Sequence, residues 1–433
     1  MFRKETPRRR RLVAPAALAV AAIMFAGCGS TQSGNGAGAS AGSNTGSNAG
    51  ATSTSAGPTT PRETSSCNHG KSALPLLPTE QQGWYKVAAS TVQYCQSPYI
   101  TWLTPHTKPP WVIGYESTYD ANTWRQLSLK HMQELVKEYE AAGLIQKFIV
   151  KESGGEPPKM IQQMSQMASE GVNAIITTSP PVSGIGGELK TLYQEHIPVI
   201  SIDGDMTSPY YLGTGGNLYE AGINQAEWLV EQLKGEGNII MVNGISGVAA
   251  SEQETKGAEA VFSEHPEMNV VASVFGDYTE APAKAAVLKV LSTHPETIDG
   301  IWVQGSMEMA SIEALQQAGR PSVPVTFGGA TNAGVYWREH PKFWSSGTIS
   351  FPTIADTNVA WEVMMRTLEG QGPKVISMVR PPVTVTYENI KELVPTNATV
   401  ASTEWLDPPE GEWWTEELVN HYFEKPANPL NFK

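Results

Sequence analysis

The stretch Gly171–Asp205, GVNAIITTSPPVSGIGGELKTLYQEHIPVISIDGD, decides the fold. Its apolar runs Ala174–Thr177 and Val199–Asp203 have the length and the Val and Ile content of buried strands. Between them, Gly187–Glu195 has the apolar spacing of a helix. A strand, a helix and a second strand in this order predict a βαβ unit, in which the two strands lie parallel.

The same alternation extends in both directions along the chain. Further strands are predicted at Trp111–Tyr115, Lys147–Val150, Asn238–Asn243, Val270–Phe275, Gly300–Gln304, Val323–Phe327 and Thr348–Phe351. Further helices are predicted at Thr123–Ala142, Pro158–Glu170, Leu218–Lys234, Ser251–Glu264, Ala281–Thr293, Met307–Ala318 and Ile354–Glu369, with Asn217 and Ser251 as N-caps. The chain is therefore predicted to be an α/β protein with parallel sheets and crossover helices.

Small and polar residues follow several of these strands. They are Asp203-Gly204-Asp205, Asn243-Gly244, Gly276-Asp277 and Gln304-Gly305-Ser306. Each of these steps on its own has the composition of an ordinary turn. Because ligands of open α/β sheets lie beyond the carboxyl ends of the strands, the recurrence of such loops indicates a binding site formed by them.

The N-terminal segment has the three parts of an export signal. Basic residues between Arg3 and Arg11 precede a mostly apolar run, Leu12–Gly27, which ends at Cys28. The run Phe25-Ala26-Gly27-Cys28 resembles a bacterial lipobox, so residues 1–27 are predicted to be removed and Cys28 to be lipidated. The other interpretation is an ordinary cleavage site followed by a chance cysteine. The sequence does not separate general secretion from twin-arginine export.

A tether and a cysteine-containing extension follow the signal. Residues 28–66 are mainly Gly, Ser, Ala, Thr and Asn and cannot bury enough apolar surface to fold, so a flexible tether is predicted. Residues 67–110 form an N-terminal extension before the first strand. Cys67 and Cys95 are an even pair in an exported chain, which favours a disulfide over two separate thiols.

Composition excludes several classes of function. The chain has 433 residues, of which 40% are apolar, and this is enough for two or three folded domains. Its net charge of −13 leaves no basic footprint for nucleic acid. The His and Cys residues show no metal-binding spacing, and Gly244-Ile245-Ser246-Gly247 lacks the spacing of a nucleophile elbow. We therefore expect neither an enzyme nor a metal or other cofactor.

One aromatic residue stands where a ligand could contact it. Trp124 follows Tyr119 and Asn122 at the start of the first predicted helix, just past a strand end. An aromatic face beside amide and carboxylate groups suits a sugar, whose C–H face stacks on the ring while its hydroxyls need donors and acceptors. The alternative is that Trp124 packs in the core between helix and sheet.

From Trp111 to about Leu393 the sequence resembles the type I periplasmic sugar-binding proteins, the ribose-binding-like receptors of ABC importers. The similarity lies in Gly171–Ile176, Ile197–Asp203, Ile298–Gly305 and Met307–Arg320. It implies two Rossmann-like lobes with parallel sheets, joined by a three-strand hinge, that clamp a ligand between them. The first lobe would comprise residues 111–214 and about 352–380, and the second 215–351 and about 381–400, followed by a tail at 401–433.

The resemblance also implies roles for individual residues. Asn122 and Trp124 match the wall of the first lobe, and Asp203 matches an acid that grips sugar hydroxyls. Gly204 and Glu254 stand where the family often has arginine, and Ala330 stands where it has aspartate, so the identity of the ligand stays open. Together with the loop residues above, the candidate ligand-binding residues are Tyr119, Asn122, Trp124, Asp203, Asp205, Glu254, Asp277, Tyr278, Gln304, Ser306, Asn332 and Phe351.

These expectations combine into one predicted function. The chain would be an exported, lipid-anchored monomer that faces the periplasm or the cell exterior. It would capture a small carbohydrate-like solute between its lobes and deliver it to an ABC permease in the membrane. The alternative is a ligand-sensing surface lipoprotein that signals through a membrane partner.

Overall fold

The computed structural model describes residues 67, 69–409 and 411–427. The predicted export signal, Cys28 and the tether at 28–66 lie outside these residues. Within the described part of the chain, no helix has both the length and the apolar character needed to cross a membrane.

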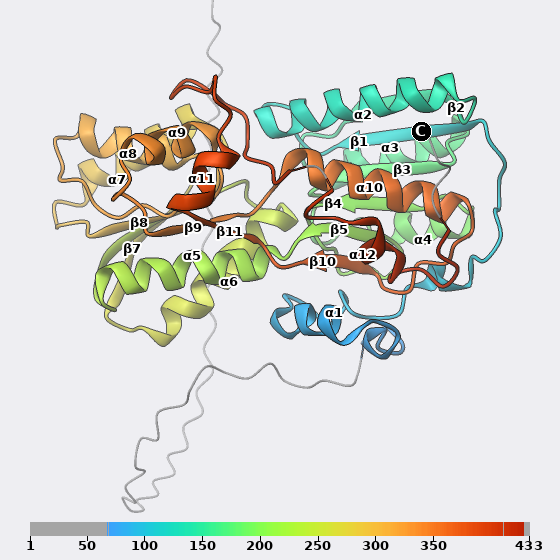
Figure 1. The fold of residues 1–433 in the computed structure, drawn as a ribbon, viewed down its shortest axis with the longest axis horizontal. Helices are drawn as coiled ribbons and strands as arrows, with labels where there is room; N and C mark the ends of the chain where they lie inside the picture. The colour runs from blue at the N-terminus through green and yellow to red at the C-terminus, as the bar shows by residue number, and fades with distance from the viewer. Residues whose placement is uncertain (1–66, 68, 410, 428–433) are drawn as a thin grey trace, which may run out of the picture. The chain divides into compact units, whose positions relative to one another are not determined.

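The first lobe is built on a six-stranded parallel sheet with the strand order β10-β5-β4-β3-β1-β2 (Figure 1). Its strands are β1 (Trp111–Ser117), β2 (Ile145–Glu152), β3 (Ala174–Thr178), β4 (Val199–Ile202), β5 (Leu212–Gly216) and β10 (Ser377–Arg380). Its helices are α2 (Thr123–Ala141), α3 (Pro157–Ser169), α4 (Gly186–Gln194) and α10 (Thr353–Leu368). The strands β1, β3 and β4 are buried almost throughout, as expected for a parallel sheet covered by helices on both faces.

The second lobe contains two smaller sheets. Three parallel strands have the order β7-β6-β8, and an antiparallel pair joins β9 to β11. The strands are β6 (Gly237–Asn243), β7 (Met268–Phe275), β8 (Gly300–Val303), β9 (Ser346–Ile349) and β11 (Val383–Thr386). The helices are α5 (Leu218–Leu233), α6 (Ala249–Glu264), α7 (Glu280–Thr293), α8 (Glu308–Gln317), α9 (Thr331–Glu339) and α11 (Tyr387–Leu393).

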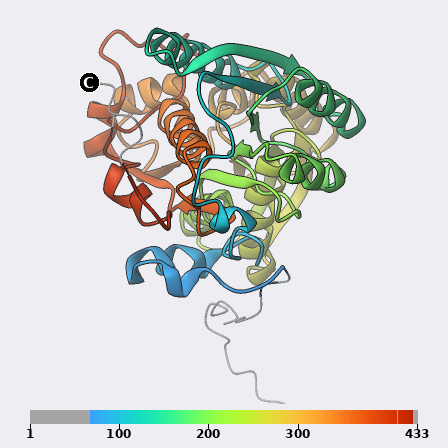
Figure 2. The ribbon, with the colours of Figure 1, turned by 90° about the vertical axis from the view of Figure 1, so that its right-hand side faces the viewer.

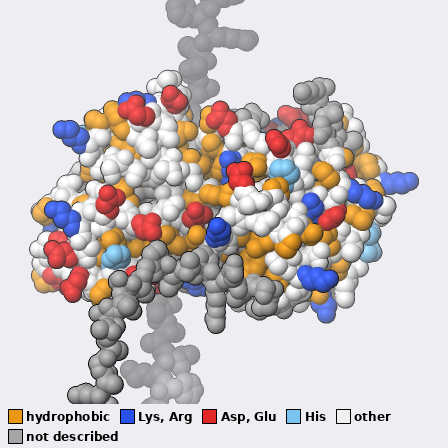
Figure 3. Space-filling view, turned by 60° about the horizontal axis from the view of Figure 1, so that its bottom comes forward, with side chains coloured by type: hydrophobic (Ala, Val, Ile, Leu, Met, Phe, Trp, Pro, Cys, Tyr) orange, Lys and Arg blue, Asp and Glu red, His pale blue; other side chains and the backbone are white. Residues whose placement is uncertain are grey.

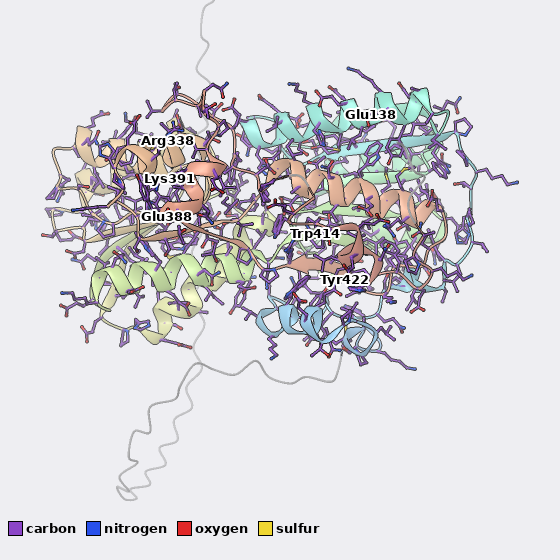
Figure 4. All side chains as sticks on the ribbon, in the orientation of Figure 1. Glu138, Arg338, Glu388, Lys391, Trp414 and Tyr422 are labelled. Carbon is purple, nitrogen blue, oxygen red and sulfur yellow. A yellow bond between two sulfur atoms is a disulfide. The ribbon has the colours of Figure 1, made fainter. Side chains whose placement is uncertain are left out.

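The chain passes between the lobes after β5, β9 and β10, which makes the three crossovers that the resemblance implied. After α11 it returns once more to the first lobe, where α12 (Glu416–Asn420) lies beside β10 (Figures 1 and 4). The Tyr422 hydroxyl donates to the Val379 carbonyl at 3.2 Å, and Phe423 forms a bridge with Pro373. The C-terminal tail is therefore a fourth connection, which the sequence analysis did not predict.

The N-terminal extension, drawn in blue in Figure 2, packs against the edge strand β10. It contains α1 (Thr79–Trp84) and three short 3₁₀ turns at Leu74–Leu76, Tyr85–Val87 and Pro98–Thr101. The backbone N–H of Ser377 donates to Gln93 O at 3.1 Å, which ties the extension to the edge of the sheet. The predicted disulfide between Cys67 and Cys95 is confirmed, with a Cα–Cα distance of 5.4 Å, and it closes this extension on itself.

The α/β class and the predicted helices are confirmed, each helix to within two residues at its ends. Asn217 is an N-cap, because its side-chain oxygen accepts from Glu220 N. Ser251 is not, since α6 begins earlier with Val248 as its N-cap and Pro180 O accepts from Ala249 N.

The strand predicted at Val323–Phe327 is wrong. Only Val325 forms a bridge, to Ile301, because Pro324 has no N–H and the Thr326 hydroxyl accepts from Val303 N in place of a backbone carbonyl. The strands β5, β10 and β11 were not predicted. In β5 the glycines obscured the pattern: a Cβ on Gly213 would collide with Ser377 of the neighbouring strand.

Candidate ligand-binding site

A small cavity of about 20 Å³ lies where the lobes meet. It is lined by Asn122, Trp124, Arg125, Ser179, Asp203, Ala250, Tyr278, Phe351 and Trp405. Such a volume holds about one water molecule. A sugar can therefore enter only when the lobes separate or the aromatic rings move.

The start of α2 forms the wall of the first lobe. Asn122 caps this helix, since its side-chain oxygen accepts from Arg125 N at 3.0 Å. This bond holds Asn122 at the cavity and sets the direction of the first helical turn. The Trp124 indole N–H donates to Phe351 O at 3.0 Å, so the ring is buried and also joins α2 to the second crossover. Trp124 is therefore packed and also lines the cavity, and contact between its ring and a ligand stays a prediction.

Asp203 lines the cavity and is 1% exposed. It follows β4 with φ 48°, and the hydroxyl of Ser179 donates to its carbonyl at 2.6 Å. The Asp203 carboxyl faces that of Asp356 in the first turn of α10, and neither carboxyl has a well-formed hydrogen bond from the described residues. Burial raises the pKa of Asp203 from 3.8 to about 8, and burial together with the charge of Asp203 raises the pKa of Asp356.

Arg125 supplies a buried positive charge beside this acid pair. Its guanidinium lies 5.9 Å from the centre of the Tyr119 ring and interacts electrostatically with Asp203, while its Nε has no acceptor among the described residues. Burial lowers the pKa of Arg125 from its ordinary value, but the group stays cationic at neutral pH. An uncharged ligand would leave this balance of buried charges unchanged.

Three further aromatic residues, Tyr278, Phe351 and Trp405, line the cavity. The Tyr278 ring meets the Phe351 ring at 5.8 Å and 77°, and Phe351 meets Trp405 at 5.4 Å and 88°. Tyr278 has φ 51°, and its ring packs on Gly244, where a Cβ would overlap it. The Tyr278 hydroxyl is buried without a hydrogen-bond partner among the described residues.

Only five of the predicted site residues line the cavity, namely Asn122, Trp124, Asp203, Tyr278 and Phe351. Asp205 instead accepts from Gln93 of the N-terminal extension at 2.5 Å and from the Tyr211 hydroxyl at 2.9 Å. Glu254 accepts from Gln225 and Ser350 in the second lobe, and burial raises its pKa to about 8.

The remaining predicted residues are not part of the cavity lining. Gln304 is fully engaged, accepting from Gly244 N and donating to Ser251 O and the Thr255 hydroxyl. Ser306 donates to Tyr278 O at 3.0 Å and so positions that residue. Asn332 bonds to Glu280, whereas Asp277 and Tyr119 are only partly buried.

Four polar or aromatic residues at the site were missed, in addition to Ala250 of the lining. Arg125 directly follows Trp124 and could have been found by extending the wall by one residue. Ser179 and Asp356 become visible only through their contacts with Asp203, and Trp405 belongs to the tail that the sequence left unassigned.

A larger hollow of about 300 Å³ lies on the second lobe beside α5 and β9. Its lining includes Trp228, Phe327, Thr348 and Thr384. The Trp228 N–H is already paired with the Ser345 hydroxyl at 2.9 Å, and every lining residue belongs to one lobe. Movement of the lobes would not enclose a ligand there, so we place the site at the smaller cavity.

Comparison with known proteins agrees with this fold. A family model described as a periplasmic binding protein domain matches residues 113–372. The xylitol-binding protein of Mycolicibacterium smegmatis is 24% identical over 38% of this chain and 47% of its own length. The ribose import binding protein of Escherichia coli is 24% identical over 43% of this chain and 63% of its own length. The matched part thus spans about half to less than two thirds of these relatives.

Solved structures of the same fold cover more of the chain. An ABC transporter solute-binding protein from Thermobispora bispora has a TM-score of 0.64 and 22% identity, and the match covers 74% of this chain and 98% of that one. One from Bacillus halodurans with bound myo-inositol has a TM-score of 0.58 and 20% identity over 66% and 98% of the two chains. The two-lobed α/β architecture and the match over most of its core show that this chain belongs to the periplasmic binding protein family, whose members are substrate-binding proteins and not enzymes.

Proposed function

We propose that this protein captures a small, uncharged sugar or polyol between its lobes and delivers it to an ABC importer. The observation that supports this most is a set of buried polar atoms on residues that line the cavity, none of which has a hydrogen-bond partner in the described part of the chain: both carboxyl oxygens of Asp203, the Tyr278 hydroxyl, Arg125 Nε and Trp405 Nε1. Buried polar groups need partners, and a polyol offers donors and acceptors at once. The aromatic wall would contact its C–H faces.

The relatives support the same class of ligand. Their names or titles mention xylitol, ribose and myo-inositol, which are all uncharged and rich in hydroxyl groups. On the face drawn in Figure 3, acidic and basic side chains are interspersed with apolar ones. The proposal therefore includes a neutral ligand.

A thermal-shift panel tests this function. Xylitol, ribose, glycerol and myo-inositol would be added to the purified protein, with arginine and citrate as charged controls. A ligand at 100 times its dissociation constant stabilises the native state by about 2.7 kcal/mol, which raises the melting temperature of a protein of this size by roughly 3 °C. Stabilisation by a charged control and by none of the polyols would contradict the proposal.

Membrane attachment through Cys28 is part of the proposal. Cys28→Ser should move the protein from the membrane fraction to the soluble fraction of the cell, because the polar tether at 28–66 has no apolar anchor of its own. Immunoblotting of the two fractions would measure the change, with Cys28→Ala as a second variant. Retention of both variants in the membrane fraction would rule out lipidation of this cysteine as the anchor.

Delivery to a permease needs its own measurement. Deleting the chain should abolish cellular uptake of the radiolabelled solute that the panel identifies, and restoring it should recover uptake. Normal uptake in the deletion strain would favour a sensory role over transport.

A further inference from the structure

We propose that Trp405, in the C-terminal tail, is a ligand-contacting wall of the binding site, with its indole N–H available to a hydroxyl of the sugar or polyol. This inference rests on the proposed function and deepens it. The match to the family model ends at residue 372, so the tail adds this residue from outside the matched region.

Trp405 is built into the second lobe by its backbone. It forms an antiparallel bridge with Ala330, and Leu406 N donates to Gly329 O at 2.9 Å. Its ring lies on Gly305, where a Cβ would come within 2.6 Å of a ring carbon. A side chain at residue 305 would therefore displace the ring. Because the ring is held in this position, we expect it to stay there and contact the ligand, rather than to move out of the cavity when a ligand binds.

The ring lines the cavity but has an unsatisfied donor. Trp405 packs edge to face with Phe351 and is buried, yet its Nε1 has no acceptor among the described residues. By contrast, the Trp124 N–H at the same cavity is paired with Phe351 O. An unpaired buried N–H costs free energy, which a ligand hydroxyl would recover.

The residues beside Trp405 fasten the tail to the first lobe. The Thr123 hydroxyl at the start of α2 donates to Thr403 O at 2.6 Å. Asp407 Oδ1 accepts from Ile354 N at 2.8 Å and from Ala355 N at 3.1 Å at the start of α10. The segment 403–407 therefore contacts both lobes beside the cavity, and Trp405 lies at its centre.

The test compares three variants by calorimetry, with whichever of xylitol, ribose, glycerol and myo-inositol binds the parent protein. Trp405→Phe keeps an aromatic ring at this position and removes the indole N–H, so it should weaken binding about tenfold. Trp405→Ala should weaken it about thirtyfold or more. Trp337→Phe is the matched control, because Trp337 is also buried in the second lobe with an unpaired Nε1 but does not line the cavity. It should bind like the parent.

The outcomes separate this inference from the function on which it rests. If the parent binds none of the four solutes, the proposed function fails and the inference falls with it. If the parent protein binds one of these solutes and the folded Trp405→Phe variant binds it as tightly as the parent or more tightly, the proposed function stands. Trp405 would then only pack in the core or block the cavity in the absence of ligand. Circular dichroism confirms folding, and Trp405→Phe keeps the test decisive if Trp405→Ala does not fold.

Discussion

Gly222→Ala and Gly257→Ala are each expected to lower the free energy of unfolding by about 3 kcal/mol. The reason is the close crossing of α5 and α6 in the second lobe. A Cβ on Gly222 would overlap the backbone carbonyl oxygen of Glu254, and a Cβ on Gly257 would overlap that of Tyr219. A rigid helical carbonyl cannot rotate away as a side chain could, so the helices would have to move apart and lose contacts along both of them.

Urea unfolding of the two variants measures this effect. Gly187→Ala is the control, because a Cβ on Gly187 in α4 would meet no heavy atom within 4 Å and the residue has no positive φ. It should change the free energy of unfolding by no more than about 1 kcal/mol. If Gly222→Ala and Gly257→Ala unfold at the same urea concentration as Gly187→Ala, the close crossing of α5 and α6 is not what the protein adopts.

The extent of sequence-based prediction differs between helices and strands. Helices such as α5 were predictable because their apolar spacing is local and Asn217 marks the start. The strand β5 was not, since its residues Leu212–Gly216 are mostly glycine. Those glycines are required by neighbours far along the chain: Ser377 beside Gly213, and Asp203 beside Gly215. A pattern of side-chain types cannot reveal a requirement set by such contacts.

The candidate site likewise contains some residues that local sequence predicts and others that it does not. Trp124 and Asp203 were predictable because each follows a strand end, where a parallel sheet gathers its loops. Asp205 follows β4 too, yet its carboxylate accepts a hydrogen bond from Gln93 of the N-terminal extension. Nothing in the local sequence indicates that partner. Trp405 and Asp356 reach the site through a tail and a crossover helix that only the folded chain brings there.

The stability of the ligand-free protein is expected to fall as the pH rises from about 5 to about 8, and Asp356→Asn is expected to flatten this fall. Asp203 and Asp356 are buried, and burial is the main cause of the raised pKa of each carboxyl; the charge of Asp203 raises the pKa of Asp356 further. The folded state therefore keeps a proton on the pair that the unfolded chain has already lost above pH 4.

The direction of the effect follows from this difference in bound protons. The pKa of Asp203 rises from 3.8 in its ordinary environment to about 8 in the fold, so between these values the folded state binds more protons than the unfolded chain. The stabilisation is complete below the lower value and is lost as the pH rises through the upper one. Each proton so retained contributes a slope of about 1.4 kcal/mol per pH unit within that window.

Asp356→Asn isolates the pair from other buried acids. Glu116 and Glu254 also have a pKa of about 8 because they are buried, and their contributions stay in the variant. An amide at residue 356 removes one titrating group and can still donate to the Asp203 carboxyl, which stays buried in the variant. The slope of the free energy of unfolding against pH should therefore decrease by about 1.4 kcal/mol per pH unit.

Urea unfolding at intervals between pH 5 and pH 9 measures both slopes. Glu170→Gln is the control, because Glu170 is solvent-exposed and its bond to Lys151 lowers its pKa. This carboxylate is ionised in the folded and unfolded states throughout the range, so its loss should leave the slope unchanged. If Asp356→Asn gives a curve parallel to that of the parent, Asp356 does not hold an additional proton in the folded state over this pH range.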